Sequence, residues 1–584
     1  MKKNLLLAIL SILSIVANAD SVEIDGISYN LNTDSHEAEV LRNDRTGYIY
    51  IPETVSYGGE SYNVTSIAFE AFAGMSFTGV SIPSSISHID RNPFMNSSFS
   101  SITVSSENPV YDSRDNCNAI IETASNTLIS GCKNTTIPST VAAIGEEAFE
   151  GCTGLNQLTI PEGVTRIGYM AFSGCYSLAS AVTIPSTVTY IGNRAFEGCG
   201  SITSVSIGSG VTSIEEGTFH LCGLSSVELP DGLISIGQEA FAYCRNLSSI
   251  NIPNSVTSIS AYAFSCSGLT SVTLPNSLTT IEYGMFSDCN SLASVSILDG
   301  VTLIMPHAFY NCNSLISVNI PSSVNNIRES AFQGCTSMTS LNIPNSVTKI
   351  GYGAFSGCTS LASIVVDNDN PAYDSRENSN AIINTSTNTL VCGCKNTIIP
   401  VGITSIGNFA FANLTDLFSI SIPNSVTTVG SDAFVRCTDL TSVTIPNSVT
   451  SIGEGTFYGC SNLTTVISYM EVPVTVAIGW GGTFTGISSE CVLKVPYGTR
   501  EAYIAQGWTT DIFKGGIFEI TSITMSPNEI CTYTNDCDLD FTDISGLKVY
   551  IASGFSPSTG ELLLTRVYKV PAGEGVLLKG EAGE

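Results

Sequence analysis

Residues 335–361 are CTSMTSLNIPNSVTKIGYGAFSGCTSL, slightly more than one period of a repeat that recurs along most of the chain. Its first half alternates apolar and polar residues up to Pro344. This is typical of a short strand with one buried face, which stops where the backbone has no N–H to donate. In its second half the apolar residues follow at spacings of three to four, as in a helical turn: Ile350, Ala354, Phe355, Cys358 and Leu361. One period therefore predicts a strand, a proline turn and a helical turn.

A phenylalanine marks the period, which is 22 to 24 residues long. The series runs through Phe149, Phe172, Phe196, Phe219, Phe241, Phe264, Phe286, Phe309, Phe332 and Phe355, resumes at Phe411, Phe434 and Phe457, and is preceded by Phe72 and Phe94. Self-similarity at such a period predicts a solenoid, in which parallel strand pairing between stacked coils buries the apolar edge that one coil leaves open. We expect the rings to stack through the core, and Gly357 to end its turn in a left-handed conformation.

The run L-x-x-I/V-x-I-P-x-S-V-x-x-I-G-x-x-A-F-x-G-C recurs from Ile137 to Cys358 and from Ile399 to Cys460. It resembles the BspA-type leucine-rich repeat of bacterial and protist surface proteins. The resemblance implies a right-handed α/β-type leucine-rich repeat solenoid, with a parallel β-sheet on the concave face and short helical turns on the convex face. It also implies secretion and adhesion-type binding to extracellular, host or matrix proteins.

The two ends of the chain differ from the repeats. Residues 1–19 have a Lys-Lys start, an apolar run and an Ala-Asn-Ala end, which predicts a signal peptide that is removed from a secreted or cell-surface protein. Residues 20–64 alternate around an Asp-Gly pair, which predicts an N-terminal β-hairpin cap over the first coil. The solenoid is predicted for residues 65–520 and includes a C-terminal cap with a short helix. Residues 521–584 lack the repeat and predict a small β-rich module.

Residues 108–138 and 370–400 are near copies of each other and interrupt the repeat. Each predicts a β-hairpin insertion, as the resembled family also has. Each contains a charged cluster, at 111–115 and 373–377, which fits either a turn fixed by an Arg–carboxylate pair or a cation site or partner contact. The Arg in each cluster favours the turn, because a cation site requires more carboxylates.

Nineteen cysteines need a structural role in a chain predicted to be exported. Twelve follow the repeat: Cys152, Cys175, Cys199, Cys222, Cys244, Cys266, Cys289, Cys312, Cys335, Cys358, Cys437 and Cys460. Parallel side chains on stacked coils favour buried thiols over a disulfide ladder. Cys392 and Cys394 form a close pair without metal-site spacing. A disulfide between Cys531 and Cys537 is left open.

The composition and the motifs disfavour several classes of partner and of activity. The net charge of −29 disfavours nucleic acid and anionic lipid as partners, since both attract Lys and Arg. The four histidines lie in different coils, and the sequence contains no nucleophile elbow, phosphate loop or paired metal ligands. We therefore predict no enzyme activity, no cofactor, no metal and no transmembrane span. Trp480 and Trp508 are predicted to cover the final coil rather than to bind sugar.

The outward positions of the predicted strands are the candidate binding surface. They form rows of short, neutral hydrogen-bonding side chains: Ser249, Asn251, Ser271, Thr273, Ser294, Ser296, Ser317, Asn319, Ser340 and Asn342. Such rows suit an extended protein or glycan partner, although Ser and Thr are also common as soluble strand residues. The leading hypothesis is an exported adhesin or protein-binding platform. The alternative is a structural or glycan-binding surface spacer without a specific protein partner.

Overall fold

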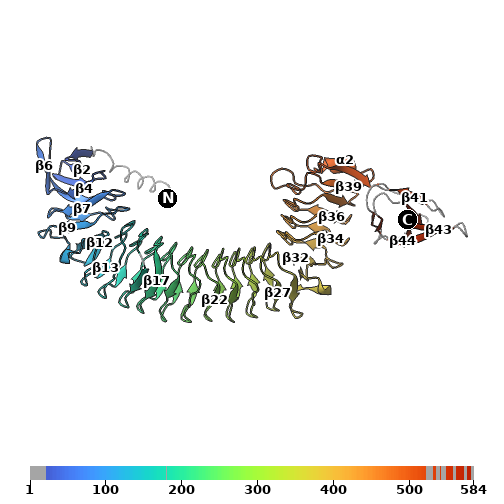
Figure 1. Ribbon diagram of the computed structural model, residues 1–584, viewed down its shortest axis with the longest axis horizontal. Coiled ribbons are helices and arrows are strands. Elements are labelled where there is room, and N and C mark those ends of the chain that lie inside the picture. Colours follow the sequence, from blue (N-terminus) through green and yellow to red (C-terminus); the bar gives the residue numbers. More distant parts are fainter. Residues whose placement is uncertain are drawn as a thin grey trace, which may run out of the picture.

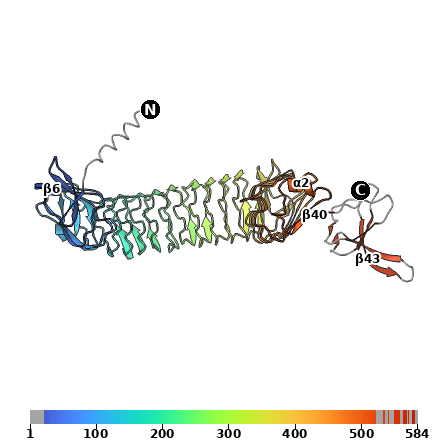
Figure 2. The ribbon, with the colours of Figure 1, turned by 90° about the horizontal axis from the view of Figure 1, so that it is seen from above.

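The structure is a computed structural model that describes residues 21–178 and 180–520, together with 531–534, 539–540, 548–556, 561–567, 569–570 and 575–579. Repeats stack as the coils of one elongated solenoid (Figure 1), and the long axis is clear when the molecule is turned (Figure 2). The fold class predicted from the repeat is thus confirmed. The predicted signal peptide and the Cys531–Cys537 pair lie outside the described residues and side chains.

The N-terminal end is an antiparallel meander that leads into the coils. Strand β1 (Ser21–Ile24) pairs with β2 (Ile27–Asn32) around the Asp-Gly turn, and β2 pairs with β3 (Glu37–Val40). Strand β6 (Glu60–Ile67) then runs parallel to β3 and antiparallel to β5 (Thr54–Tyr57). The first coils add β4 (Gly47–Tyr50), β7 (Phe77–Ile82), β8 (His88–Ile89) and β9 (Ser101–Val104).

Most coils contribute to two rows of parallel strands. The first row precedes the proline turn and contains β15 (Ser180–Ile184), β17 (Ile202–Ile207), β19 (Ser226–Glu228), β22 (Ser271–Thr273), β24 (Ser294–Ser296), β27 (Ser340–Ile343) and β29 (Ser363–Val366). The second row follows that turn and contains β13 (Ala143–Ile144), β14 (Arg166–Ile167), β16 (Tyr190–Ile191), β18 (Ser213–Ile214), β20 (Ser235–Ile236), β21 (Ser258–Ile259), β23 (Thr280–Ile281), β25 (Leu303–Ile304), β26 (Asn326–Ile327) and β28 (Lys349–Ile350). Both rows pair in register, so equivalent side chains line up from coil to coil.

Both rows continue after the second insertion. The strands there are β33 (Ser405–Ile406), β34 (Ser419–Ser421), β35 (Thr428–Val429), β36 (Ser442–Ile445), β37 (Ser451–Ile452), β38 (Thr465–Ser468), β39 (Val492–Pro496) and β40 (Gly516–Ile520). The C-terminal region contains β41 (Cys531–Thr534), β42 (Leu539–Asp540), β43 (Lys548–Ser556), β44 (Glu561–Val567), β45 (Lys569–Val570) and β46 (Gly575–Lys579), which pair antiparallel. This end is therefore β-rich.

The turns around the phenylalanines are not helical, which corrects one detail of the expected repeat. In the coil of Phe309, His307 has a φ of 58° and Asn311 a φ of 55°, and such left-handed residues interrupt a helix. The Phe309 N–H donates to the carbonyl of Ala331 in the next coil (2.8 Å) rather than to its own turn. Two tight turns give the same three-to-four spacing as a helix, so the pattern could not distinguish them. Gly357 has the predicted left-handed conformation, with a φ of 71°.

The phenylalanine rings stack from coil to coil, as predicted, in runs that end at the insertions. From Phe149 to Phe355, successive centroids lie 5.0–5.7 Å apart with interplanar angles of 4–14°. A second stack runs from Phe411 to Phe484 at 5.0–5.3 Å. We call these residues the spine phenylalanines. Their rings are almost wholly buried, so they carry a large part of the apolar burial of each coil.

The repeat cysteines lie beside the spine as buried thiols. Eleven of the twelve are buried, and only Cys266 is partly exposed. The Cys312 Sγ lies 3.1 Å from the carbonyl of Phe286, the spine residue of the preceding coil, and the same thiol-to-carbonyl contact recurs along the spine. Cys266 differs because Ser267 takes the inward position of its coil and contacts the Cys289 Sγ at 3.4 Å.

We expect the repeat thiols to resist alkylation in the native protein. Burial raises the pKa of Cys358 and Cys460 to about 12, so the reactive thiolate is scarce at mildly alkaline pH. Iodoacetamide should label Cys266 first among the twelve, and all twelve after denaturation without reductant. Mass spectrometry of the labelled peptides checks this. Fewer than about half of the thiols free after denaturation would show disulfides instead.

The two insertions are the corners of the solenoid. They contain the hairpins β11 (Ala119–Glu122)–β12 (Thr127–Gly131) and β31 (Ala381–Asn384)–β32 (Thr389–Gly393). The line of coils changes direction near β12 and again near β32 (Figure 1). The buried apolar residues form three separate clusters that meet at these hairpins. We call the coils before β11, those between β12 and β31, and those after β32 the first, second and third segments.

Each hairpin strand faces two cores. Ile120 belongs to the core of the first segment, whereas Ala119 and Ile121 belong to the second. In the other hairpin, Ile382 belongs to the second core, and Ala381 and Ile383 to the third. Because successive strand residues point to opposite faces, one apolar tripeptide can close one core and open the next.

The charged clusters of the insertions fix turns. They lie on β10 (Tyr111–Asp112) with the 3₁₀ turn η1 (Arg114–Asn116), and on β30 (Tyr373–Asp374) with η2 (Arg376–Asn378). The Arg114 Nε donates to Asp112 at 2.8 Å, and its Nη1 donates to Asn126 at 2.8 Å. The same contacts recur around Arg376. Among the described residues, no group of three His, Cys, Asp or Glu side chains is placed to hold a metal ion.

The exit of the solenoid is closed by one tryptophan and not by two. Helix α2 (Arg500–Ala505) leads to Trp508, which is fully buried and donates from Nε1 to the Val474 carbonyl at 2.8 Å. Trp480 is 99 % exposed, so the prediction that it covers the final coil is wrong. The ring of Trp508 packs against Phe484 and Phe513 and fills the position that Trp480 was expected to share. Over the described residues, no helix has the length and apolarity needed to cross a membrane.

Candidate binding surface

The ten candidate residues all lie on the outward side of the coil edge that carries the first strand row, which we call the strand face. Every one of them is exposed, whereas the apolar residues between them, such as Val272 and Leu341, are buried. The register places Ser271 opposite Ser294 and Thr273 opposite Ser296, so the expected rows are continuous there. The alternation of the sequence thus predicted correctly that these side chains face solvent; their role in binding stays a prediction.

Among the coils that carry the ten candidate residues, the strand face is interrupted at two that the sequence did not single out. Residues 249–252 and 317–320 are not strands, and β19 is not joined to β22 nor β24 to β27. No backbone group of residues 249–252 bonds to another backbone group of the described chain. The side-chain pattern of these coils matches that of paired β27, so no local signal marks the interruption. Backbone donors and acceptors are consequently available at the surface, in addition to the hydroxyl and amide side chains.

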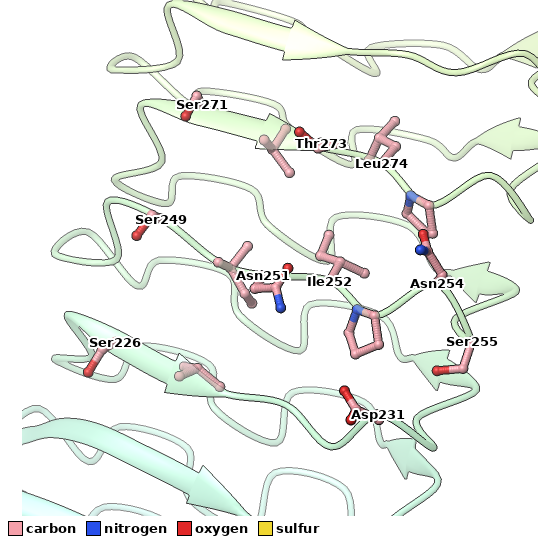
Figure 3. A pocket seen from close by; sticks show the side chains of 15 residues that line it. Ser226, Asp231, Ser249, Asn251, Ile252, Asn254, Ser255, Ser271, Thr273 and Leu274 are labelled. Carbon is pink, nitrogen blue, oxygen red and sulfur yellow. The ribbon is translucent and has the colours of Figure 1, made fainter.

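A shallow depression of about 880 Å³ lies over the first interruption. Ser226, Ser249 and Ser271 lie one above another on three successive coils (Figure 3). Asn251 and Thr273 lie farther along the same coils, towards the proline turns. Four of the five belong to the predicted set; Ser226 was missed, although it has the same strand position.

A single carboxylate stands at one end of this depression. Asp231 lies beside the proline turn, on the same side as Asn254 and Ser255 (Figure 3). Sequence analysis missed it because Asp231 takes the turn position that Asn, Ser or Glu occupies in other coils. The depression thus offers hydroxyls, amides and one anionic acceptor, which can hold a polar chain by several hydrogen bonds.

The histidines of the described coils lie apart from one another. The His220 Nδ1 lies 3.3 Å from the Glu239 carboxylate, and His88 pairs with Asp90, each on its own part of the solenoid. His307 contacts the rings of Tyr283 and Tyr310. None of these histidines lines the depression on the strand face. The geometry of that face is suited to binding.

Comparison with known proteins finds one family and several solved structures that are similar to the chain. A family model described as the BspA type leucine rich repeat region matches residues 60–127, 120–224, 189–316, 284–390 and 381–474. No curated protein matches the chain. A solved leucine-rich repeat protein from Bacteroides ovatus is 28 % identical, with 77 % of this chain and 94 % of that chain covered and a TM-score of 0.44. A leucine rich cell surface protein from Faecalibacterium prausnitzii is 21 % identical, with 87 % and 96 % covered and a TM-score of 0.37.

The family model extends over residues 60–474, which is well over half of the chain and includes both corners. The stacked phenylalanines and the paired strand rows show that the matched repeats form the expected coils. This protein belongs to the BspA-type leucine-rich repeat family.

Proposed function

We propose that the protein is an exported binding protein whose strand face holds an extended protein partner. The observation that carries the proposal is the exposure of all ten polar side chains on a surface whose intervening residues are buried. The leader-like pattern of residues 1–19 and the family support export to the cell surface or the medium. Extracellular host or matrix proteins are the partners that this function requires.

A solenoid surface of this kind binds a partner through many contacts spread over a large area. Its side chains are short and neutral, so each contact with a partner contributes little, and many contacts must add up. The buried Ile and Val residues beneath them hold the backbone in place, which lowers the entropy that binding costs. The interrupted coils add open N–H and C=O groups to this surface. An extended chain that crosses several coils can use both kinds of group at once.

A spacer without a protein partner is the second candidate. The same hydroxyl and amide rows suit a glycan, and they also keep a long rod in solution without any ligand. The depression at Ser249 and Asn251 favours a glycan over an inert spacer, because it gathers donors and acceptors in one hollow. The two candidate functions differ in the ligands that the purified protein should bind.

Arginines on the strand face should weaken binding to a protein partner. The test uses an array of matrix proteins and polysaccharides and compares the wild type with Ser317→Arg/Asn319→Arg. We expect saturable protein binding that falls at least about tenfold in the variant, because two long charged side chains hold the partner off the surface. Surface plasmon resonance on the array hits measures the change.

A matched control separates contact from charge. Asn325→Arg/Glu329→Gln changes the net charge by the same amount at exposed positions of the same coil, away from the strand face. This control should bind as the wild type does. Absence of protein binding at micromolar concentrations would remove the protein-binding proposal, and binding confined to polysaccharides would establish the second candidate.

A further inference from the structure

The strongest unexplained feature of the third segment is the display of Trp480. Its side chain is 99 % exposed, although burying a tryptophan is normally among the larger gains available to a fold. The final coil does not need it, because Trp508 and Phe513 already close that end. A large aromatic side chain that is kept out of an available core points to an interaction outside the chain.

The loop that carries Trp480 is held firmly. The Thr485 hydroxyl donates to the Gly479 carbonyl at 2.7 Å, and the Gly482 N–H donates to the same carbonyl at 3.0 Å. The Thr483 hydroxyl donates to the Gly453 carbonyl of the preceding coil at 3.2 Å, which ties the loop to the solenoid. The backbone that carries the ring is therefore held in place, so little backbone entropy is lost when a ligand stacks on Trp480.

A hollow of about 380 Å³ lies beside the ring. It is lined by residues of four successive coils, among them Phe409, Asp432, Arg436 and Tyr458. Phe409 is 36 % exposed, so a second aromatic side chain borders the hollow. The site lies around the spine turns and is separate from the strand face.

Two charged groups line the hollow without an ion-pair partner. Among the described side chains, none forms an ion pair or hydrogen bond with the Asp432 carboxylate or the Arg436 guanidinium. Glycines in the next coil make room for them: a Cβ on Gly455 would lie 2.2 Å from the Asp432 Oδ1, and one on Gly459 would lie 3.1 Å from the Arg436 Cγ. The hollow thus offers one strong acceptor and one strong donor next to an aromatic ring.

We propose that Trp480, Phe409, Asp432 and Arg436 form a binding site for a neutral glycan. A pyranose ring has an apolar C–H face that stacks on an aromatic ring, and its hydroxyls both donate and accept hydrogen bonds. Asp432 accepts from such hydroxyls and Arg436 donates to them. A phosphate or an anionic lipid surface fits less well, because Asp432 faces the hollow and the chain carries a net charge of −29.

The test uses the full chain and its own fluorescence. Trp480 and Trp508 are the only tryptophans, and Trp508 is fully buried, so acrylamide quenching of the native protein reports on Trp480. Titration with soluble starch, laminarin, galactomannan and xylan should protect the fluorescence from acrylamide with at least one of them. Titration calorimetry with that polysaccharide should then show affinity at least about tenfold lower for Trp480→Ala, and a smaller loss for Trp480→Phe.

Two further variants show whether the hollow itself is used. Asp432→Asn should also weaken binding, because it removes the charged acceptor. Ile478→Ala, an exposed apolar residue outside the lining, should bind as the wild type does. The proposal is overturned if none of the four polysaccharides binds, if Trp480→Ala binds unchanged, or if phosphatidylcholine vesicles alone protect the fluorescence. The proposal does not depend on the strand face, so Ser317→Arg/Asn319→Arg should retain this binding.

Discussion

Replacing Phe309 by alanine is expected to lower the local stability of the second segment by about 3–5 kcal/mol, the cost of truncating a buried phenylalanine. The ring is fully buried and stacks on Phe286 at 5.4 Å and on Phe332 at 5.0 Å. A coil touches only its neighbours, so the damage should be greatest in the coils on either side. Hydrogen exchange with mass spectrometry over residues 286–335 measures the loss of protection.

The position of a phenylalanine in the stack should set the size of this effect. Phe355 is also buried, but it has one stacked neighbour, Phe332, because the second corner follows it. Phe355→Ala should therefore cost less than Phe309→Ala by roughly the value of one aromatic pair, about 0.5–1.5 kcal/mol. Tyr352→Ala, at a 64 % exposed side chain, serves as the control and should leave protection unchanged. Equal losses for Phe309 and Phe355 would show that stacking adds nothing to burial.

Enlarging Gly393 to valine is expected to disrupt the second corner. A Cβ at this position would lie 2.2 Å from the ring of Phe411, the first spine residue of the third segment. The ring must move or the hairpin must shift, and overpacking of this kind costs about 1–3 kcal/mol, sometimes more. The third segment should lose hydrogen-exchange protection over residues 403–460, while the second segment retains its own.

The first corner and an open glycine provide the comparisons. Gly131 has the same relation to Phe149, with a Cβ at 2.0 Å, so Gly131→Val should destabilise the start of the second segment instead. Gly200→Ala meets no atom within 4 Å and should be neutral or slightly stabilising. If Gly393→Val were as harmless as Gly200→Ala, the close packing of the spine against the hairpin would not hold the corner.

The two hairpins show which structural features the sequence pattern predicts and which it does not. The near-identical insertions could be located and assigned as hairpins, because they break the period and contain strand and turn residues. Their role as corners depends on Ile120 and Ile382 facing a different core from their neighbours. A run of three apolar residues in a strand indicates burial on both faces. It does not indicate that the two faces belong to differently directed stacks of coils.

The strand face and the tryptophans show structural features that the sequence pattern does not indicate. The alternation predicted which strand residues point outward. The interruption at residues 249–252 has no signal, because the same pattern of apolar and polar residues pairs normally in β27. Residue type does not distinguish Trp480 from Trp508, because both are tryptophans in the same region. Which of them closes the final coil is decided by competition for one space, and Trp508 fills it.

The amino-acid pattern alone determined the coil: its period, its aromatic stack, its buried thiols and the side of the strand that faces water. These properties are local, since each depends on residues within one repeat and its neighbour. Tertiary packing alone decided the turn geometry, the corners, the depression on the strand face and the exposure of Trp480. These features depend on backbone hydrogen bonds between coils and on which of several apolar side chains fills a buried position. The outcome of that competition depends on the whole folded chain.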